Sequence, residues 1–472
     1  MADSDIVFQP ASKLGPLIKT RKLSPVEVVR AYLDRIDAVD PKVGAFITVT
    51  REQALRQAEE ATKEIAAGHY RGPLHGLPYA PKDLLATKGV RTTNGSKITA
   101  DWIPSYESTI TARLNDAGAI LLGKLHSVEF AIGSHWSAPF GLARNPWHLD
   151  YSPSGSSSGP GAAVGARMTP LAIGTDTGGS IRKPAHSCGI VGLKPTYGRV
   201  SRFGVTTLSW TLDHAGPMTT TVADNALLLQ AISGADPLDA SAAAEPVPDF
   251  TKALTGDIKG LRIGVPKKYF FDGIEEETAA AVRTALAKLS EIGAVLVDVD
   301  VANAELIGPA SAVIRLSEAA SFHEKRLKEH AELFEPLVRQ NLEVASFYSA
   351  LDYIRAVRMR SVFIDEVRRL FERCDVMAAP VANPAPKLQP ETARSEAATK
   401  SAISSPADTF NLGNMTGIPA IVVPCGFTAG PPSLPVGIQF YSKAYDEATL
   451  FRVADAYQSV TEWHKHRPPI TA

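Results

Sequence analysis

The chain has 472 residues, of which 44% are hydrophobic and 21% charged, and its formal net charge is −1. Such a balance is typical of a globular protein with one large core or a few smaller ones. It provides no basic surface for nucleic acid or for an anionic membrane, so a small polar or neutral ligand is the expected partner. Three widely spaced cysteines show no metal-ligand spacing and indicate reduced thiols: Cys188, Cys374 and Cys425.

The first residues, "MADSDIVFQP", are acidic and have none of the apolar stretch of a secretory signal. No apolar run approaches the roughly 18–20 residues that a membrane span needs. We therefore expect a cytoplasmic protein that has no membrane partner, no metal and no other cofactor.

Residues 10–67 are predicted to be helical, because Ser24-Pro25-Val26-Glu27 forms a capping box ahead of apolar residues at helical spacing. From about residue 70, short apolar runs alternate with helical stretches. Seven of these runs are predicted strands: 119–124, 169–174, 261–266, 294–301, 375–381, 420–426 and 435–442. This alternation predicts an α/β fold around a mostly buried sheet.

The chain divides by composition into successive stretches of one domain, residues 1–472. These are an N-terminal helical region (1–69), a core (70–232), a connector rich in Ala, Pro and Asp (233–262) and a second half (263–472). Within the second half, residues 314–373 are predicted to be a helical excursion from one sheet, because strand-like runs resume after them.

Three segments rich in Gly, Ser and Lys are the candidates for chemistry: 75–89, 151–164 and 171–189. In the last, a strand running into Gly178-Gly179-Ser180 frees the backbone to turn, so that successive N–H groups converge as an oxyanion hole requires. A plain turn with a capping serine explains this segment equally. In the first, Lys82 is either a general base made neutral by burial or half of a solvated pair with Asp83.

The middle segment, "YSPSGSSSGPGAAV", also contains G-x-S-x-G, the nucleophile elbow of Ser-His-Asp hydrolases, with Ser157 as nucleophile. That motif needs a buried strand directly before it. The residues that precede it, "NPWHLDYSPS", are polar and interrupted by proline, which disfavours the elbow.

Taken together and in this order, the three segments resemble the amidase signature family. The resemblance is carried by a block from Ser154 to Pro184 that continues through 188–204, with further similarity at 145–147, 216–218 and 414–440. It implies a single layered α/β domain in which a large twisted mixed β-sheet is covered by helices on both faces.

The resemblance also implies a Ser–cis-Ser–Lys triad. Ser180 matches the nucleophile that forms the acyl-enzyme, Ser156 matches the serine that relays the proton, and Lys82 matches the general base. The peptide bond between Gly155 and Ser156 is expected to be cis. The resemblance assigns the oxyanion hole to the backbone N–H groups of Thr177, Gly178, Gly179 and Ser180, and supporting contacts to Gly155, Ser157, Asp176 and Arg182.

The sequence departs from the family pattern at several places. Ser154 and Ser158 stand where the family has glycine, which is tolerable only if neither position needs a positive φ. His126 and Ser127 replace the Asn-Met of many members, in a loop expected to lie over the substrate, with loop packing as the alternative role. Lys183 is expected near the pocket, where it would favour a polar or anionic acyl group.

The resemblance therefore implies a hydrolase that cleaves the carbon–nitrogen amide bond of a small substrate, with carbamates and esters as further candidates. One family relative is the amidotransferase A subunit, which liberates ammonia from glutamine. Arg360 falls at the glutamine-binding arginine of that subunit, but Ala407, next to Asp408, stands in place of its ligand aspartate.

This difference favours a stand-alone amidase whose partners are a small amide-like molecule and at most a second copy of the chain, with no nucleic acid. A Ser-His-Asp hydrolase using Ser157 remains as one alternative, and the amidotransferase A subunit remains as the other.

Overall fold

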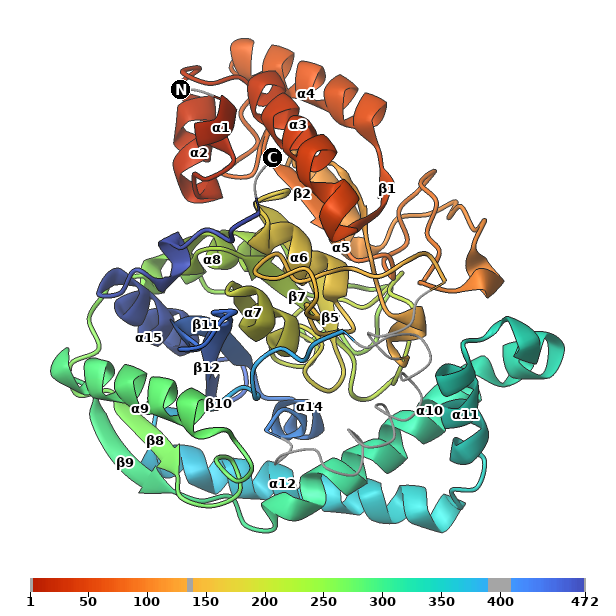
Figure 1. Ribbon diagram of the computed structural model, residues 1–472, viewed down its shortest axis with the longest axis vertical. Coiled ribbons are helices and arrows are strands. Elements are labelled where there is room, and N and C mark those ends of the chain that lie inside the picture. Colours follow the sequence, from red (N-terminus) through yellow and green to blue (C-terminus); the bar gives the residue numbers. More distant parts are fainter. Residues whose placement is uncertain (1–2, 134–138, 389–408, 471–472) are drawn as a thin grey trace.

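The computed structural model describes residues 3–133, 139–388 and 409–470 (Figure 1). A mixed sheet of ten strands, in the order β3-β2-β5-β7-β6-β11-β12-β10-β8-β9, lies beside a two-stranded sheet of β1 and β4. The strands are β1 (Phe46–Val49), β2 (Pro78–Pro81), β3 (Ile120–Leu121), β4 (Gly123–Leu125), β5 (Leu171–Asp176), β6 (Val191–Lys194), β7 (His214–Thr219), β8 (Arg262–Pro266), β9 (Val295–Val299), β10 (Val376–Pro380), β11 (Ala420–Phe427) and β12 (Pro435–Ser442).

Helices flank this sheet, with α1 to α4 at one end of the molecule and α10 to α12 at the other (Figure 1). They are α1 (Asp3–Ile6), α2 (Ala11–Lys19), α3 (Pro25–Val43), α4 (Arg51–Ala66), α5 (Thr109–Asp116), α6 (Ser158–Gly165), α7 (Arg182–Cys188), α8 (Val222–Ile232), α9 (Glu276–Glu291), α10 (Ile307–His330), α11 (Pro336–Ala345), α12 (Ala350–Arg373), α14 (Asn411–Thr416) and α15 (Glu447–Ser459). Among the residues described, no helix is both long enough and apolar enough to span a membrane. The predicted α/β fold with a large mixed sheet is confirmed.

Local sequence signals account for many of these elements. Ser24 caps α3, since its Oγ accepts a hydrogen bond from the N–H of Glu27 at 3.1 Å and its own N–H donates to the Glu27 carboxylate at 2.7 Å. Six of the seven predicted strands form within a few residues of their expected ends, whereas residues 119–124 contribute to two short strands, β3 and β4, which belong to different sheets. The helical region 10–67 is interrupted by β1, which pairs with β4.

Three strands of the large sheet were not predicted: β2, β6 and β7. Strand β2, Pro-Tyr-Ala-Pro, begins and ends with proline, and β7 contains both glycine and proline, so both have poor intrinsic strand propensity. They form because each is paired on both sides, β2 with β3 and β5, and β7 with β5 and β6. Pairing in the sheet here outweighs local preference.

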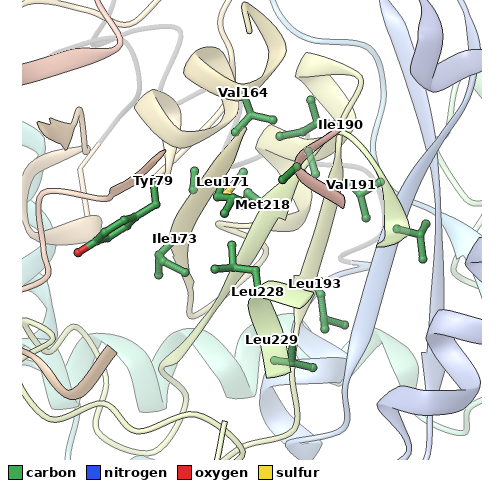
Figure 2. Close-up of a cluster of buried hydrophobic side chains, with 14 of the residues drawn as sticks. Tyr79, Val164, Leu171, Ile173, Ile190, Val191, Leu193, Met218, Leu228 and Leu229 are labelled. Carbon is green, nitrogen blue, oxygen red and sulfur yellow. The ribbon is translucent and has the colours of Figure 1, made fainter. Parts of the chain in front are cut away.

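The two faces of the central strands are packed differently. On one face, a methyl group on Gly174 or Gly192 would lie 3.0 Å from the Ile181 side chain, just before α7. The segment that leads into α7 packs this closely against the sheet because these two strand positions are glycine. Side chains of alternate residues point the other way. Ile173, Val191 and Leu193 pack with Leu228 and Leu229 of α8 in the cluster drawn in Figure 2.

The helical excursion forms α10, α11 and α12, between β9 and β10 in the chain. Strand β8 pairs in parallel with β9, which precedes the excursion, and with β10, which follows it. The chain therefore leaves one sheet and returns to it. The division at residues 70, 233 and 263 stays a prediction, and residues 407 and 408 lie outside the described part of the chain.

Candidate active site

Lys82 lies immediately after β2, and its side chain is fully buried. Its backbone N–H donates to the carbonyl of Ile173 at 2.9 Å, which fixes the residue beside β5. Its Nζ donates to Ser156 Oγ at 2.7 Å and to Thr175 Oγ1 at 2.9 Å. Burial lowers the pKa of this amine from 10.5 to about 7, against the opposing influence of nearby carboxylates.

A second buried lysine holds the turn that follows Lys82. The carboxylate of Asp83 accepts hydrogen bonds from the N–H and Oγ1 of Thr93 and lies 3.5 Å from the Nζ of Lys124. Lys124 also donates to the carbonyl of Leu85 at 2.6 Å. Asp83 is thus part of a structural anchor, and the solvated Lys82–Asp83 pair is not what forms.

Ser156 precedes α6, and the Gly155–Ser156 peptide bond is cis, as expected. The next residue, Ser157, is fully buried: its Oγ accepts from the N–H of Thr175 at 3.2 Å and donates to the Thr175 carbonyl at 3.1 Å. Ser157 therefore fastens the start of α6 to β5. Both hydroxyl contacts are made to backbone, which does not fit the role of an elbow nucleophile.

Asp176 organises the turn that carries Ser180. Its carboxylate accepts the N–H of Gly179 at 2.8 Å and of Ile181 at 3.1 Å, and binds Arg182 through two hydrogen bonds of 3.0 Å. Both charged side chains are fully buried, and Arg182 holds the pKa of Asp176 well below its usual range. Asn414 of α14 closes the cluster by donating to the same carboxylate at 3.0 Å.

The four backbone N–H groups predicted for an oxyanion hole differ in whether they are already hydrogen-bonded within the turn. The N–H of Gly179 is already bonded to Asp176. Among the described residues, none accepts a hydrogen bond from the N–H of Thr177, Gly178 or Ser180. Thr177 is further held by its Oγ1, which donates to Asp213 at 2.6 Å. The turn therefore offers at most three convergent donors.

A cavity of about 300 Å³ opens beside this turn, and both Ser156 and Ser180 line it. Apolar side chains line part of it: Val128, Ala131, Ile132, Leu208 and Leu316. Lys183, Arg315 and Asn341 contribute its charged and amide groups. Of these, only Lys183 was predicted, since Arg315 and Asn341 come from α10 and α11, far along the chain from any motif.

Other predicted site residues have different positions. His126 is buried, with its ring nitrogens 2.9 Å from the Gly141 carbonyl and 3.3 Å from Ser158 Oγ, and Ser127 Oγ donates to the Val128 carbonyl. Neither lines the cavity, so the structure supports loop packing as their role.

Of the two positions where the family has glycine, Ser154 has φ 62°, whereas Ser158 begins α6. Ser154 therefore adopts a left-handed conformation that costs a non-glycine residue on the order of 1 kcal/mol. The requirement that neither serine position has a positive φ is therefore not met at Ser154.

Arg360, on α12, donates through Nε to the carbonyl of Met415 at 2.8 Å and does not line the cavity. Ala407, on which the preference for a stand-alone amidase rested, is not among the described residues. The described residues contain no group of three or more His, Cys, Asp or Glu side chains that could hold a metal ion.

The model of the amidase family matches residues 27–451 of the chain. The chain belongs to the amidase signature family. Like other amidases, it is a hydrolase of carbon–nitrogen amide bonds, and the Ser-Ser-Lys triad is characteristic of this family.

The chain is similar to the A subunit of the glutamyl-tRNA(Gln) amidotransferase of Moorella thermoacetica, at 40% identity over 99% of both chains. Its fold resembles a chain from a vestigial protein complex that reveals the evolutionary origins of an s-triazine catabolic enzyme (TM-score 0.89, 31% identity, 98% and 100% of the two chains). It also resembles the peptide amidase of Stenotrophomonas maltophilia (TM-score 0.87, 30% identity, 98% and 99%).

These likenesses correct two expectations. The preference for a stand-alone amidase is wrong, because a relative matching almost the whole chain is named as part of an amidotransferase. The restriction of partners to a small amide and a second copy of the chain, with no nucleic acid, is wrong for the same reason: that name includes glutamyl-tRNA(Gln). Similarity along the whole chain to an amidotransferase A subunit is stronger evidence than the single difference at Ala407.

Proposed function

We propose that this amidase releases ammonia from a small carboxamide as the hydrolytic component of an amidotransferase-type enzyme, with Ser180 as nucleophile, Ser156 as proton relay and Lys82 as general base. The observation that carries the chemistry is the 2.7 Å hydrogen bond between Lys82 and Ser156. It links a fully buried amine to a hydroxyl that shares a cavity with Ser180.

The proton path follows from the depressed pKa of Lys82. With a pKa of about 7, the amine is substantially neutral at physiological pH and can accept a proton from Ser156. Ser156 in turn takes the proton of Ser180, whose oxygen forms a bond to the amide carbon. Thr175 Oγ1 accepts a second hydrogen bond from the Lys82 amine and so helps to keep the amine beside Ser156.

The negative charge that develops on the carbonyl oxygen would be bound by the free N–H groups of the turn. Asp176 fixes this turn through Gly179 and Ile181, so the donors are pre-oriented and need no reorganisation as the charge appears. The carbon–nitrogen bond then breaks, and the proton on Lys82 returns through Ser156 to the leaving amine. Water, activated in the same way, hydrolyses the acyl-enzyme and regenerates Ser180.

The role within a larger amidotransferase is supported by the similarity to the Moorella protein across nearly all of both chains. The likeness to a chain from a vestigial protein complex is a second indication that proteins of this architecture assemble with others. Ammonia released in the cavity would then be the nitrogen source for a second reaction.

Release of ammonia from glutamine, asparagine and simple aliphatic amides tests the chemistry, with Ser180→Ala beside Ser157→Ala as matched serine variants. We expect Ser180→Ala to abolish release and Ser157→Ala to retain it in the folded fraction. Labelling by a sulfonyl fluoride on a residue other than Ser180 would contradict the assignment.

The role within an amidotransferase is tested separately, by adding the remaining amidotransferase components of the source organism and glutamyl-tRNA(Gln). We expect amide nitrogen to be transferred to the tRNA-linked glutamate. If ammonia is released but no transfer occurs with any partner, the hydrolase assignment stands and the amidotransferase role fails.

A further inference from the structure

We propose that Arg315, together with Lys183, selects amides whose acyl group carries a carboxylate, so that the preferred substrate is the monoamide of a short dicarboxylic acid. This inference rests on the proposed function, because it concerns the acyl side of the same cavity. It adds Arg315, a specificity-determining residue that no sequence motif indicated, and narrows the polar or anionic acyl group expected from Lys183 to a carboxylate.

The first observation is the position of Arg315. It is placed by α10, the first helix of the excursion, and lines the cavity with Ser156 and Ser180. A methyl group built on Gly178 would lie 2.9 Å from Arg315 Nη1, so the guanidinium lies directly over the turn that ends in Ser180. A substrate whose carbonyl is bound at this turn would have its acyl group within reach of this cation.

The second observation is that a further cation lines the same cavity. Lys183 follows Ser180 by three residues at the start of α7, and its Nζ lies 4.4 Å from the centre of the Phe410 ring. The ring braces the long side chain from one side. Two cations from separate elements, α7 and α10, thus border one cavity.

The third observation concerns the other residues that line the cavity within the described ranges. They are apolar or neutral, with Leu208 and Ile132 among the apolar groups and Asn341 supplying an amide. This part of the wall suits a chain of methylene groups ending in an anion.

The size of the cavity sets the length of that chain. At about 30 Å³ per water molecule, 300 Å³ holds on the order of ten water-sized groups. Since the leaving group is ammonia, nearly all of this space is available to the acyl group. A four- or five-carbon dicarboxylic acid monoamide, such as succinamate or glutaramate, is of about this size.

The test compares kcat/KM for glutaramate with that for pentanamide, its neutral counterpart. We expect glutaramate to exceed pentanamide by about 10- to 100-fold, as for a hydrogen bond to a charged group. Arg315→Met should remove most of the advantage over pentanamide, chiefly through KM. Arg315→Lys should restore part of it, and Lys183→Met should give a smaller loss.

Arg355→Met, an exposed arginine on α12, is the control and should leave every ratio unchanged. A merely structural role of Arg315 would lower kcat/KM equally for charged and neutral amides, and that result would overturn the proposal. A wild-type preference for pentanamide would also overturn it, while leaving the hydrolase assignment intact.

Binding to Ser180→Ala provides a readout that does not depend on turnover. Calorimetry should show glutaramate binding at least about 10-fold more tightly than pentanamide, and Arg315→Met should abolish the difference. Equal affinities would refute the selection of an anionic acyl group even if no amide is hydrolysed. Failure of the proposed function would instead appear as no ammonia release from any carboxamide in the presence of intact glutaramate binding.

Discussion

The pH dependence of Ser180 acylation is the sharpest test of the role of Lys82. Desolvation lowers the pKa of this lysine from 10.5 to about 7, which at about 1.4 kcal/mol per pH unit costs the ammonium form about 5 kcal/mol. At pH 8 such an amine is about 90% neutral, whereas an exposed lysine is neutral in only about 0.3% of molecules. Burial thus enriches the base form by about 300-fold.

Because the neutral amine is the base, the rate of acylation should rise with pH through about 7 and level off above about 8. The measurement is the second-order rate constant for inactivation by phenylmethylsulfonyl fluoride between pH 5.5 and 9, which needs no knowledge of the natural substrate. Lys82→Met should lower this rate by about 10²–10⁴-fold and abolish the inflection. Lys88→Met, an exposed lysine in the same segment, is the control and should change neither.

A rate that is flat over this range would refute the reasoning, since the protonation state of Lys82 would then not limit acylation. A rate that still rises tenfold per pH unit at pH 9 would also refute it, because the amine would then behave as an exposed lysine. An inflection near 7 that persists in Lys82→Met would assign the titration to another group.

Three further predictions concern the surroundings of the triad. Ser157→Ala should lower the free energy of unfolding in urea by about 1–3 kcal/mol, because it leaves the backbone groups of Thr175 without partners; an unchanged midpoint would contradict this. Asp176→Asn should cost about 3–5 kcal/mol by breaking the buried pair with Arg182. Since the pKa of Asp176 is lowered, its contribution to stability is complete above about pH 5 and is lost as pH falls, so the difference in the free energy of unfolding between wild type and Asp176→Asn should shrink in acid. Gly178→Ala should reduce kcat at least about 10-fold with little change in stability, because its methyl would lie 2.9 Å from both the Arg315 guanidinium and Asn411 Oδ1; full activity would contradict this.

The sequence predicted the strands that lie in mainly apolar runs and missed β2 and β7, whose residues are unsuited to a strand. Apolar runs such as residues 420–426 are strands in any buried setting, and β11 formed there. Strands β2 and β7 depend on partners distant in the chain, β5 above all, which local preference does not reveal.

The candidate site residues divide in the same way, into those that a sequence pattern indicates and those that only the fold brings to the site. Lys82, Ser156 and Ser180 were predicted because their order along the chain forms a long pattern, and in the structure the Lys82 amine is hydrogen-bonded to Ser156. Arg315 was missed, because it stands on a helix with no motif and meets the site only through the fold. For His126 the sequence left two roles open, and the structure favours loop packing because the ring lies against Ser158 and the Gly141 carbonyl.

The return of the excursion to its own sheet has an evolutionary consequence. Lys82 and Thr175 are set by β2 and β5, near one end of the ten-stranded order, whereas the chain leaves from β9 and re-enters at β10, at the opposite end. The helices between these exits can lengthen, shrink or be exchanged without altering the strand pairs that hold the catalytic lysine. On the proposed roles of Lys82 and Arg315, a change in α10 would therefore alter the substrate range without altering those strand pairs.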